Sequence, residues 1–213
     1  MMEERTTGIV LRTRLLTETS LIVHWLTADA GRIATVARGA RRPKSPFRGK
    51  LDLFHAAAIS FRRSRRSELH TLCEVMLEET FPTLRADWHR LSQAAYGAAL
   101  VEQTTETETP VPETYAQFRR FLEVVARRPT SPLPVLAFEL KHLAELGLLP
   151  DLERESLPAE SGRLAADLLR IEWERFEDVA TSTAAVPPLV RFLHGFLIYH
   201  LDRLPRGRAE ALG

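Results

Sequence analysis

The spacing of hydrophobic residues changes near residue 82, and this change limits the possible folds of the 213-residue chain more than any other feature. Before this point the chain holds short runs rich in branched and aromatic residues, which are typical of strands. After it, apolar residues recur every three or four positions, which is typical of helices with one buried face. The sequence therefore predicts an α+β chain in which strands come first and helices follow.

The first part of the chain predicts five short strands. They cover residues 8–16, 20–27, 32–37, 51–61 and 68–77. A hairpin turn is expected at residues 28–31, Ala-Asp-Ala-Gly, and a loop over residues 38–50, which hold two Gly and two Pro. This pattern fits an OB-type β-barrel over residues 1–81, although an SH3-like barrel would give a similar string of strands.

The remainder, residues 82–213, predicts an α-helical bundle as a second domain. Helical spacing occurs over residues 84–104, from Pro112, from Pro132 to Gly147, over residues 161–177 and over residues 187–204. Proline is tolerated in the first turn of a helix and glycine favours its end, which supports these limits. Residues 150–162 are expected to form a loop.

Composition excludes several classes of protein. No window approaches the roughly 18 uninterrupted apolar residues of a membrane span, and the first residues lack an apolar signal core. Cys73 is the only cysteine, so the chain can form neither an internal disulfide nor a thiolate metal cluster. We expect a cytoplasmic protein with no membrane partner.

Positive charge is concentrated between Arg32 and Arg66, where eleven basic residues face one acid, Asp52. The formal net charge of +1 hides this concentration, because residues 1–81 hold fourteen basic and nine acidic residues and residues 82–213 hold fifteen and nineteen. Such a surface is suited to phosphate, although charge runs are often only solvated surface. The candidate nucleic-acid-binding residues are Arg32, Arg38, Arg41, Arg42, Lys44, Phe47, Arg48, Lys50, Arg62, Arg63, Arg65 and Arg66.

Aromatic side chains could add base stacking to these phosphate contacts. Phe47 lies inside the basic loop, so we expect it outside the core and available to a base. Trp25, Phe54 and Phe61 lie in strand patterns and are expected in the core. Many arginines with few available aromatics predict binding led by the backbone of the nucleic acid, with little sequence preference.

The sequence contains no recognisable catalytic, cofactor-binding or metal-binding motif. The seven histidines lack metal-site spacing, and there is no Gly-rich phosphate loop. Four acids near the predicted fourth helix are explained by ion pairs with Arg170 and Arg175. These acids are Glu172, Glu174, Glu177 and Asp178. We therefore expect neither catalysis nor a cofactor.

Five segments, in the same order along the chain, resemble the RecO family of bacterial recombination mediators. They are residues 8–14, 26–42, 51–55, 139–150 and 200–212. The second segment is the most informative, because Leu26-Thr27, Gly31 and the run Ala-Arg-Gly-Ala-Arg-Arg at 37–42 follow the family's pattern LT…G…A-K/R-G-A/G-R. The last two segments are similar to a helix-to-loop turn and to the family's C-terminal end.

The resemblance implies an N-terminal OB-fold, a helical domain and a role in DNA repair. It implies binding of single- and double-stranded DNA and annealing of complementary strands without ATP. It also implies two protein partners, RecR and the C-terminal tail of single-strand-binding protein, with which the protein would help to load RecA onto coated single strands. A nucleoid-associated location follows from this role.

The chain departs from the family pattern at one point. Many members carry a four-cysteine zinc module after the Gly-x-x-Pro turn, whereas residues 151–162 here contain no cysteine. A zinc site of that kind is not available, so no metal is expected at this position.

The helical part could hold the partner peptide, because a tail that ends in acids and an aromatic residue would suit apolar side chains beside cations. This placement depends on the family, and an ordinary amphipathic bundle would explain the same residues. The candidates are Arg119, Arg120, Phe121, Arg127, Arg128, Phe138, Lys141 and His142.

Three other functions stay open from the residues alone. The alternative to a DNA-binding mediator is an OB-fold protein that binds RNA or associates with the ribosome, which a preference for RNA over DNA would indicate. A nuclease would require metal-dependent strand cleavage. A purely scaffolding subunit would bind a RecR-like partner without binding DNA.

Overall fold

The computed structural model describes residues 3–150, 157–179 and 182–213. Contacts divide the chain into two compact units. The barrel unit contains Met1–Pro82 and Thr105–Ala116, and the helical unit contains Thr83–Thr104 and Gln117–Gly213. The sequence predicts a domain boundary near residue 81. This boundary stays a prediction, and it takes no account of Thr105–Ala116, which returns to the barrel.

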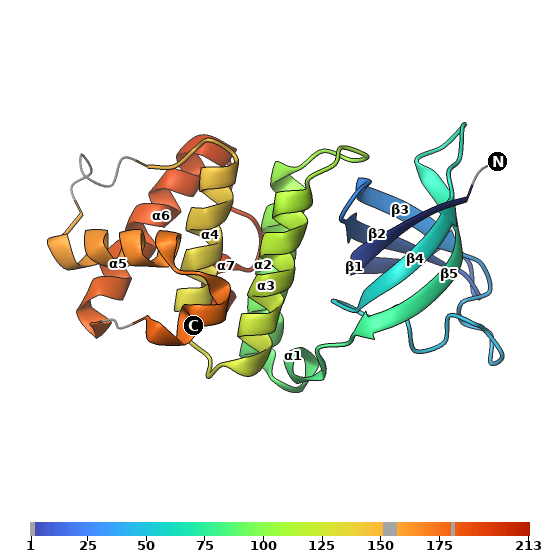
Figure 1. Cartoon of the computed structure of the whole chain (residues 1–213), viewed down its shortest axis with the longest axis horizontal. Coiled ribbons are helices and arrows are strands. Elements are labelled where there is room, and N and C mark those ends of the chain that lie inside the picture. Colours follow the sequence, from blue (N-terminus) through green and yellow to red (C-terminus); the bar gives the residue numbers. More distant parts are fainter. Residues whose placement is uncertain (1–2, 151–156, 180–181) are drawn as a thin grey trace. The chain divides into compact units, whose positions relative to one another are not determined.

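Five strands close into a barrel in the order β1-β2-β3-β5-β4 (Figure 1). They are β1 Glu3–Leu15, β2 Leu21–Thr27, β3 Gly31–Ala37, β4 Ala56–Arg62 and β5 Leu69–Glu79. All neighbouring pairs are antiparallel except β3 and β5, whose parallel pairing closes the barrel. The predicted OB-type barrel of five strands is confirmed.

The barrel core forms because successive residues of a strand point to opposite faces. Along β3, buried and half-buried residues alternate without a break. Trp25, Phe54 and Phe61 are buried, as expected, and the Trp25 indole donates a hydrogen bond of 2.9 Å to Thr35 Oγ1. This bond satisfies the polar atom that the large ring brings into the core.

Two strands start five residues away from the predicted position. The first strand starts at Glu3 because residues 3–9 pair with β4. The fourth starts only at Ala56, since the preceding chain makes turns, in which Lys50 N–H donates to Phe47 O and His55 N–H donates to Asp52 O. The hydrophobic pattern of residues 51–55 therefore reflects burial within a turn and not a strand.

The segment Thr105–Ala116 packs on the barrel beside the start of β3. Glu108 N–H donates to Arg32 O at 2.9 Å, and Thr107 and Arg32 form a parallel bridge. Gly31 makes this approach possible, because a Cβ there would lie 1.9 Å from Thr109 O and because its φ of +67° favours glycine. The sequence shows this segment only as a polar break between two helices.

The helical unit confirms the predicted bundle. Its helices are α1 Pro82–Ala86, α2 Trp88–Thr104, α3 Pro112–Arg127, α4 Leu133–Glu145, α5 Ala159–Arg170, α6 Val186–Leu201 and α7 Arg208–Leu212. Helix α1 begins at the unit boundary, and the first turn of α3 lies in the barrel unit. Two 3₁₀ turns lie at Trp173–Asp178 and Thr183–Ala185. The helix expected over 161–177 ends at Arg170, because Ile171 and Glu172 are extended. Of the loop expected over 150–162, residues 151–156 lie outside the described residues, and α5 already begins at Ala159.

A buried ion pair joins α4 to α7. Arg208 is 5 % exposed and Glu139 is 0 % exposed, and the guanidinium donates from Nε and Nη2 to the two carboxylate oxygens at 2.6 and 2.9 Å. The Tyr96 hydroxyl, from α2, also donates to this carboxylate. Burial, with the neighbouring Glu139 carboxylate, raises the pKa of Tyr96 well above its ordinary value, so the hydroxyl keeps its proton.

Candidate nucleic-acid interface

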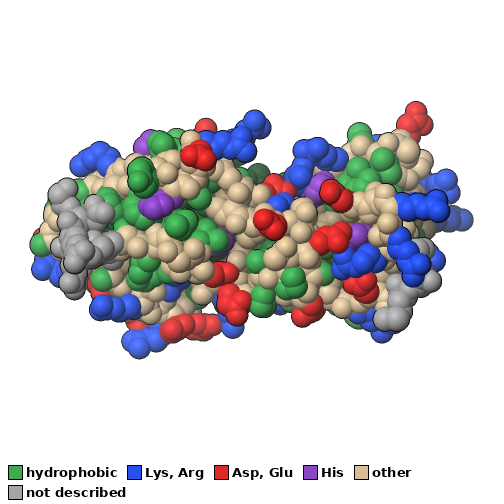
Figure 2. All heavy atoms as spheres, turned by 90° about the horizontal axis from the view of Figure 1, so that it is seen from above, with side chains coloured by type: hydrophobic (Ala, Val, Ile, Leu, Met, Phe, Trp, Pro, Cys, Tyr) green, Lys and Arg blue, Asp and Glu red, His purple; other side chains and the backbone are tan. Residues whose placement is uncertain are grey.

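The basic stretch forms two separate projections of the barrel. The cationic loop, residues 38–50, follows β3 in the connection to β4, and the hairpin tip, residues 62–67, begins at the last residue of β4 and leads to β5. The two leave different corners of the barrel (Figure 1). Lys and Arg side chains gather over the barrel at the right of the view in Figure 2.

The backbone of the cationic loop is held by consecutive tight turns. Arg42 N–H donates to Gly39 O and Ser45 N–H donates to Arg42 O, both at 3.0 Å. The loop is also fixed to the turn between β1 and β2, because Arg41 N–H donates to Thr19 O at 3.0 Å. An anchored backbone presents its cations at lower entropic cost than a mobile one would.

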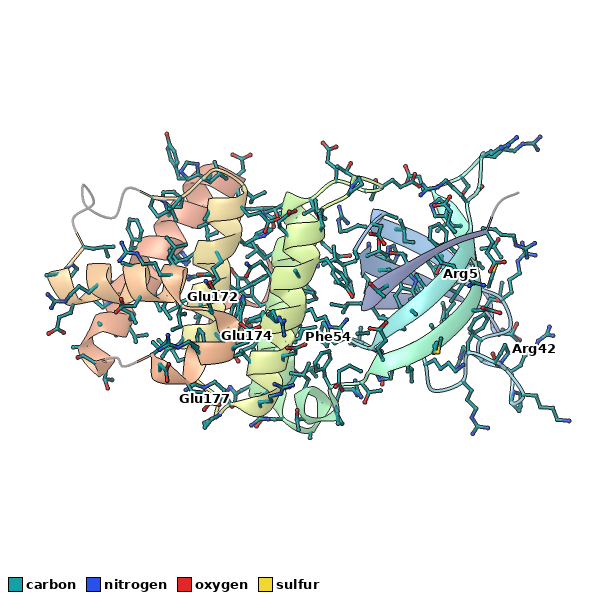
Figure 3. The ribbon with its side chains drawn as sticks, viewed as in Figure 1. Arg5, Arg42, Phe54, Glu172, Glu174 and Glu177 are labelled. Atoms are coloured by element: carbon teal, nitrogen blue, oxygen red, sulfur yellow. The ribbon has the colours of Figure 1, made fainter. Side chains whose placement is uncertain are left out.

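Five cations of this loop are exposed. They are Arg38, Arg41, Arg42, Lys44 and Arg48. Arg41, Arg42 and Arg48 line a hollow of about 500 Å³, and Figure 3 shows Arg42 on the loop at the end of the barrel. Exposed guanidinium groups around a hollow suit phosphate oxygens, which accept their forked hydrogen bonds.

The expectation that Phe47 lies outside the core is wrong. Its side chain is 7 % exposed and belongs to the barrel core with Val10 and Trp25. The loop folds over the end of the barrel, which buries the ring and fixes the turns on either side of it. Lys50 is likewise turned inward, since its ammonium group donates to Val75 O at 2.9 Å.

The hairpin tip exposes Arg62, Arg65 and Arg66. Ser64 and Ser67 hold its turn, because their hydroxyl oxygens accept hydrogen bonds from the backbone N–H groups of Arg66 and Leu69. The two serines therefore use their side chains on the local backbone, as is common in turns. The three arginine side chains are therefore exposed at a turn that serine hydroxyl groups hold.

Arg63, by contrast, is held inside the barrel unit. It donates to both carboxylate oxygens of Glu4, at 2.9 and 3.1 Å, and to Glu108 at 2.6 Å. The hydrogen bonds from Arg63 lower the pKa of Glu4, and those to Glu4 raise the pKa of Arg63. Arg32 is engaged too, since its Nε donates to Thr105 Oγ1 at 2.8 Å. The sequence predicts both arginines on the phosphate-binding surface, whereas their side chains are used within the barrel unit.

His70 completes this network. It is 1 % exposed and stacks on Phe61, its Nδ1 accepts from Ser64 N–H at 3.3 Å, and its Nε2 lies 2.9 Å from Glu108. These contacts place the proton of the neutral ring on Nε2. Burial lowers the pKa of His70 from its ordinary value of 6.5, although the Glu108 carboxylate opposes this shift.

We expect the barrel to lose stability as the pH falls below about 6.5, because the unfolded chain then takes up a proton at His70 that the folded barrel resists. Above that pH the ring is neutral in both states and contributes no slope. Urea unfolding at pH 7.5 and 5.5, followed by the NMR signal of the Trp25 indole, measures the change. His70→Gln should reduce this loss of stability between pH 7.5 and 5.5, whereas His89→Gln, at an exposed position, should leave it unchanged. An equal loss in both variants would show that His70 does not cause it.

The predicted peptide site is not formed as expected. Phe121, Phe138 and His142 are each 0 % exposed, and the two phenylalanines stack with ring centroids 4.6 Å apart. His142 Nε2 lies 2.6 Å from Thr104 Oγ1, and burial lowers the pKa of His142 to about 4. These side chains form the core of the helical unit, so they cannot receive a peptide without a rearrangement of that core.

Most cations of that predicted site are engaged within the helical unit. Arg120 contacts Glu123 and Glu174, both at 3.1 Å, Arg119 lies 3.7 Å from Glu123, and Figure 3 labels Glu174 on its 3₁₀ turn. Arg128 donates to Phe176 O and lies over the Phe176 ring. Lys141 donates to Leu169 O at 2.7 Å, and burial lowers its pKa. Arg127 is exposed.

Within residues 3–150, 157–179 and 182–213, no group of three or more His, Cys, Asp or Glu side chains is arranged to hold a metal ion. The same residues include no helix with the length and apolar character needed to cross a membrane. The predicted ion pairing of the acidic run is present at Arg175, which lies 3.0 Å from Asp178.

Comparison with known proteins identifies the family. Residues 1–81 match the model described as recombination protein O N terminal, and residues 85–158 match recombination protein O C terminal. The chain belongs to the RecO family. The resemblance to this family is thereby confirmed, and the matched residues include four of the five segments, all except residues 200–212.

Several curated relatives of this RecO chain are named DNA repair protein RecO. That of Symbiobacterium thermophilum is 38 % identical over 147 residues, which cover 68 % of this chain and 57 % of the relative. That of Anaeromyxobacter sp. strain K is 33 % identical over 147 residues, covering 69 % and 58 %, and that of Syntrophus aciditrophicus is 32 % identical over 151 residues, covering 70 % and 58 %. The chain thus spans less than two thirds of the length of these relatives.

Proposed function

We propose that this RecO-family chain is a DNA repair protein that binds single- and double-stranded DNA and anneals complementary strands without ATP. The observation that carries the proposal is the set of eight exposed cations on two anchored projections of one barrel, five on the cationic loop and three on the hairpin tip. The names of the relatives support DNA repair as the setting. The protein would act by bringing strands together and not by making or breaking bonds.

Annealing requires two polyanions to approach each other. Each cation placed against a phosphate releases condensed counterions and lowers the repulsion between the strands. Two projections at different corners of the barrel can each engage a strand, which a single patch would do less well. Because phosphate contacts carry no sequence information, the bases stay available to find their complements.

The partners follow from family membership and belong to the same proposal. With RecR, the protein would help to load RecA onto single strands coated by single-strand-binding protein, whose C-terminal tail it would contact. We place this activity in the cytoplasm, at the nucleoid. The tail would need a surface other than the buried rings of Phe121 and Phe138, or a rearranged helical unit.

Salt titration of oligonucleotide binding, combined with annealing without ATP, tests the proposal. We expect log K to fall linearly with log salt concentration with a slope of about −2 to −5, because each engaged phosphate of a single strand contributes roughly −0.7. Annealing of complementary oligonucleotides should be faster with the protein than without it. Absence of binding at low salt, or annealing no faster than the spontaneous rate, would remove the proposed function.

A further inference from the structure

A trough of about 680 Å³ is lined by residues of β1, β4 and β5, by Asp29 and by the cationic loop, and it reaches the core residues Phe47, Ile59 and Val75. Two cross-strand rows form it, Arg5, Ser60 and Glu74 in one and Thr7, Ala58 and Met76 in the next. Residues directly opposite one another share a face of the sheet, so the small side chains of β4 form the floor and longer ones form the sides. Figure 3 shows Arg5 on this part of the barrel.

A bulge and the cationic loop complete the trough. β5 carries one extra residue, Cys73, between the positions that pair with Ser60 and Phe61 of β4. Such a bulge bends a strand and re-aims its side chains, and Cys73 lines the trough beside the floor. Pro46 and Lys50 of the cationic loop also line it, and the Lys50 ammonium group donates to Val75 O of β5. The trough therefore opens next to the side chains that the proposed function assigns to phosphate.

Ser60 lies at the floor of the trough with an unsatisfied hydroxyl. Its neighbours in the strand, Ile59 and Phe61, belong to the barrel core, so Ser60 points outward. It is only 3 % exposed, yet its Oγ has no hydrogen-bond partner within the described part of the chain. Buried hydroxyl groups are normally paired. Arg5 and Glu74 flank it with long, exposed side chains that can swing aside for a ligand.

The lining suits a nucleobase. Ala58 and Met76 offer apolar surface to the faces of a ring, and the Met76 side chain is 69 % exposed. The Ser60 hydroxyl can bond to the edge of the base, and Asp29 and Glu74 can accept from its amino groups. Arg5 lies at the rim, where the sugar–phosphate chain would pass. Double-stranded DNA keeps its bases stacked and paired, so only a single strand could supply one.

We propose that this trough receives one unstacked base of a single DNA strand whose phosphates lie on the cationic loop. This inference rests on the proposed function, and it adds a base contact to an interface otherwise made with phosphate. The base contact gives the protein a preference for single strands over duplexes of equal charge. It also gives the OB-type barrel a ligand contact on the wall made by β1, β4 and β5.

Filling the trough tests the proposal. Ala58→Phe would place a ring over the floor, and an aromatic residue is well tolerated in a strand. The probe is an oligonucleotide with a single 2-aminopurine, whose fluorescence rises when the base leaves the stack. Wild type should raise this fluorescence, whereas Ala58→Phe should abolish the rise and weaken single-strand binding about tenfold. Affinity for a duplex of the same length should stay within about twofold.

Ala34→Phe is the matched control, because Ala34 faces outward from β3 and does not line the trough. It should keep the fluorescence rise and the single-strand affinity. If Ala58→Phe does not fold, Ser60→Ala serves instead, with a smaller fluorescence rise expected. Wild type that binds no DNA would remove the proposed function itself. If the wild type binds DNA and a folded Ala58→Phe variant shows the same fluorescence rise and the same affinity, the proposed base site is wrong and the proposed function still stands. The trough would then be a candidate site for a protein segment.

Discussion

Replacing Arg208 with Met is expected to destabilise the helical unit by about 3–5 kcal/mol, which is the usual effect of leaving one charge of a buried pair without its partner. The Glu139 carboxylate would remain 0 % exposed with the Tyr96 hydroxyl as its donor, while both guanidinium bonds would be lost. The effect should extend to α7, because this pair connects α7 to α4. Urea unfolding followed by circular dichroism at 222 nm reports it, since helices dominate that signal.

Two comparison variants separate charge from packing. In Glu139→Gln with Arg208→Met, the amide still accepts from Tyr96 and no charge is buried, so most of the lost stability should return. Arg206→Met changes an exposed arginine near the same helix and should stay within about 0.5 kcal/mol of wild type. A loss below about 1 kcal/mol in the single Arg208 variant would show that the pair does not hold α7 in place.

Changing Arg41, Arg42 and Lys44 together to Glu is expected to weaken binding of single-stranded DNA by about 100-fold at 0.1 M salt. Each lost phosphate contact removes roughly 0.7 from the slope of log K against log salt concentration. Three lost contacts should therefore make this slope shallower by about 2, which corresponds to the expected loss of affinity at 0.1 M salt. Annealing without ATP should slow in parallel, because it depends on the same contacts. The three side chains are exposed on an anchored loop, so the change should leave the thermal stability nearly unaltered.

The matched control reverses three exposed arginines of the helical unit, Arg163, Arg170 and Arg191, and alters the net charge by the same amount. If binding depends on the cationic loop, this control should retain affinity within a few-fold of wild type. Equal losses in the two triple variants would mean that overall charge, and not the loop, governs affinity. The proposed interface would then have to be assigned elsewhere.

The fold could be predicted because its signals are local. Alternation of apolar residues set the strand count, and the turn at residues 28–31 fixed one hairpin, which β2 and β3 confirm. The predicted strand limits were wrong where they depend on residues that are distant in the sequence. Glu3–Thr7 reads as a polar end, yet it pairs with β4. No local pattern distinguishes a strand at residues 51–55 from turns buried by the same apolar residues.

The candidate site was predictable as a region and not residue by residue. Exposure of Arg41 and Arg42 follows from a loop rich in Gly and Pro, whereas the partners of Arg63 lie at distant positions in the sequence, at Glu4 and Glu108. Phe47 was misplaced because a loop residue can fold over the end of a barrel. The trough was missed altogether, since only strand register brings Arg5, Ser60 and Glu74 into one row.

The return of Thr105–Ala116 to the barrel bears on how the chain matures during synthesis. A nascent chain that ends at residue 81 has all five strands but lacks Glu108 and Thr105, which hold Arg63 and Arg32. Domains usually fold as units while the ribosome is still extending the chain. Here α2 must leave the ribosome before Thr105–Ala116 can pack on the barrel. The part of the chain that matches the N-terminal family model can therefore complete its fold only after some of the part that matches the C-terminal model has been synthesised.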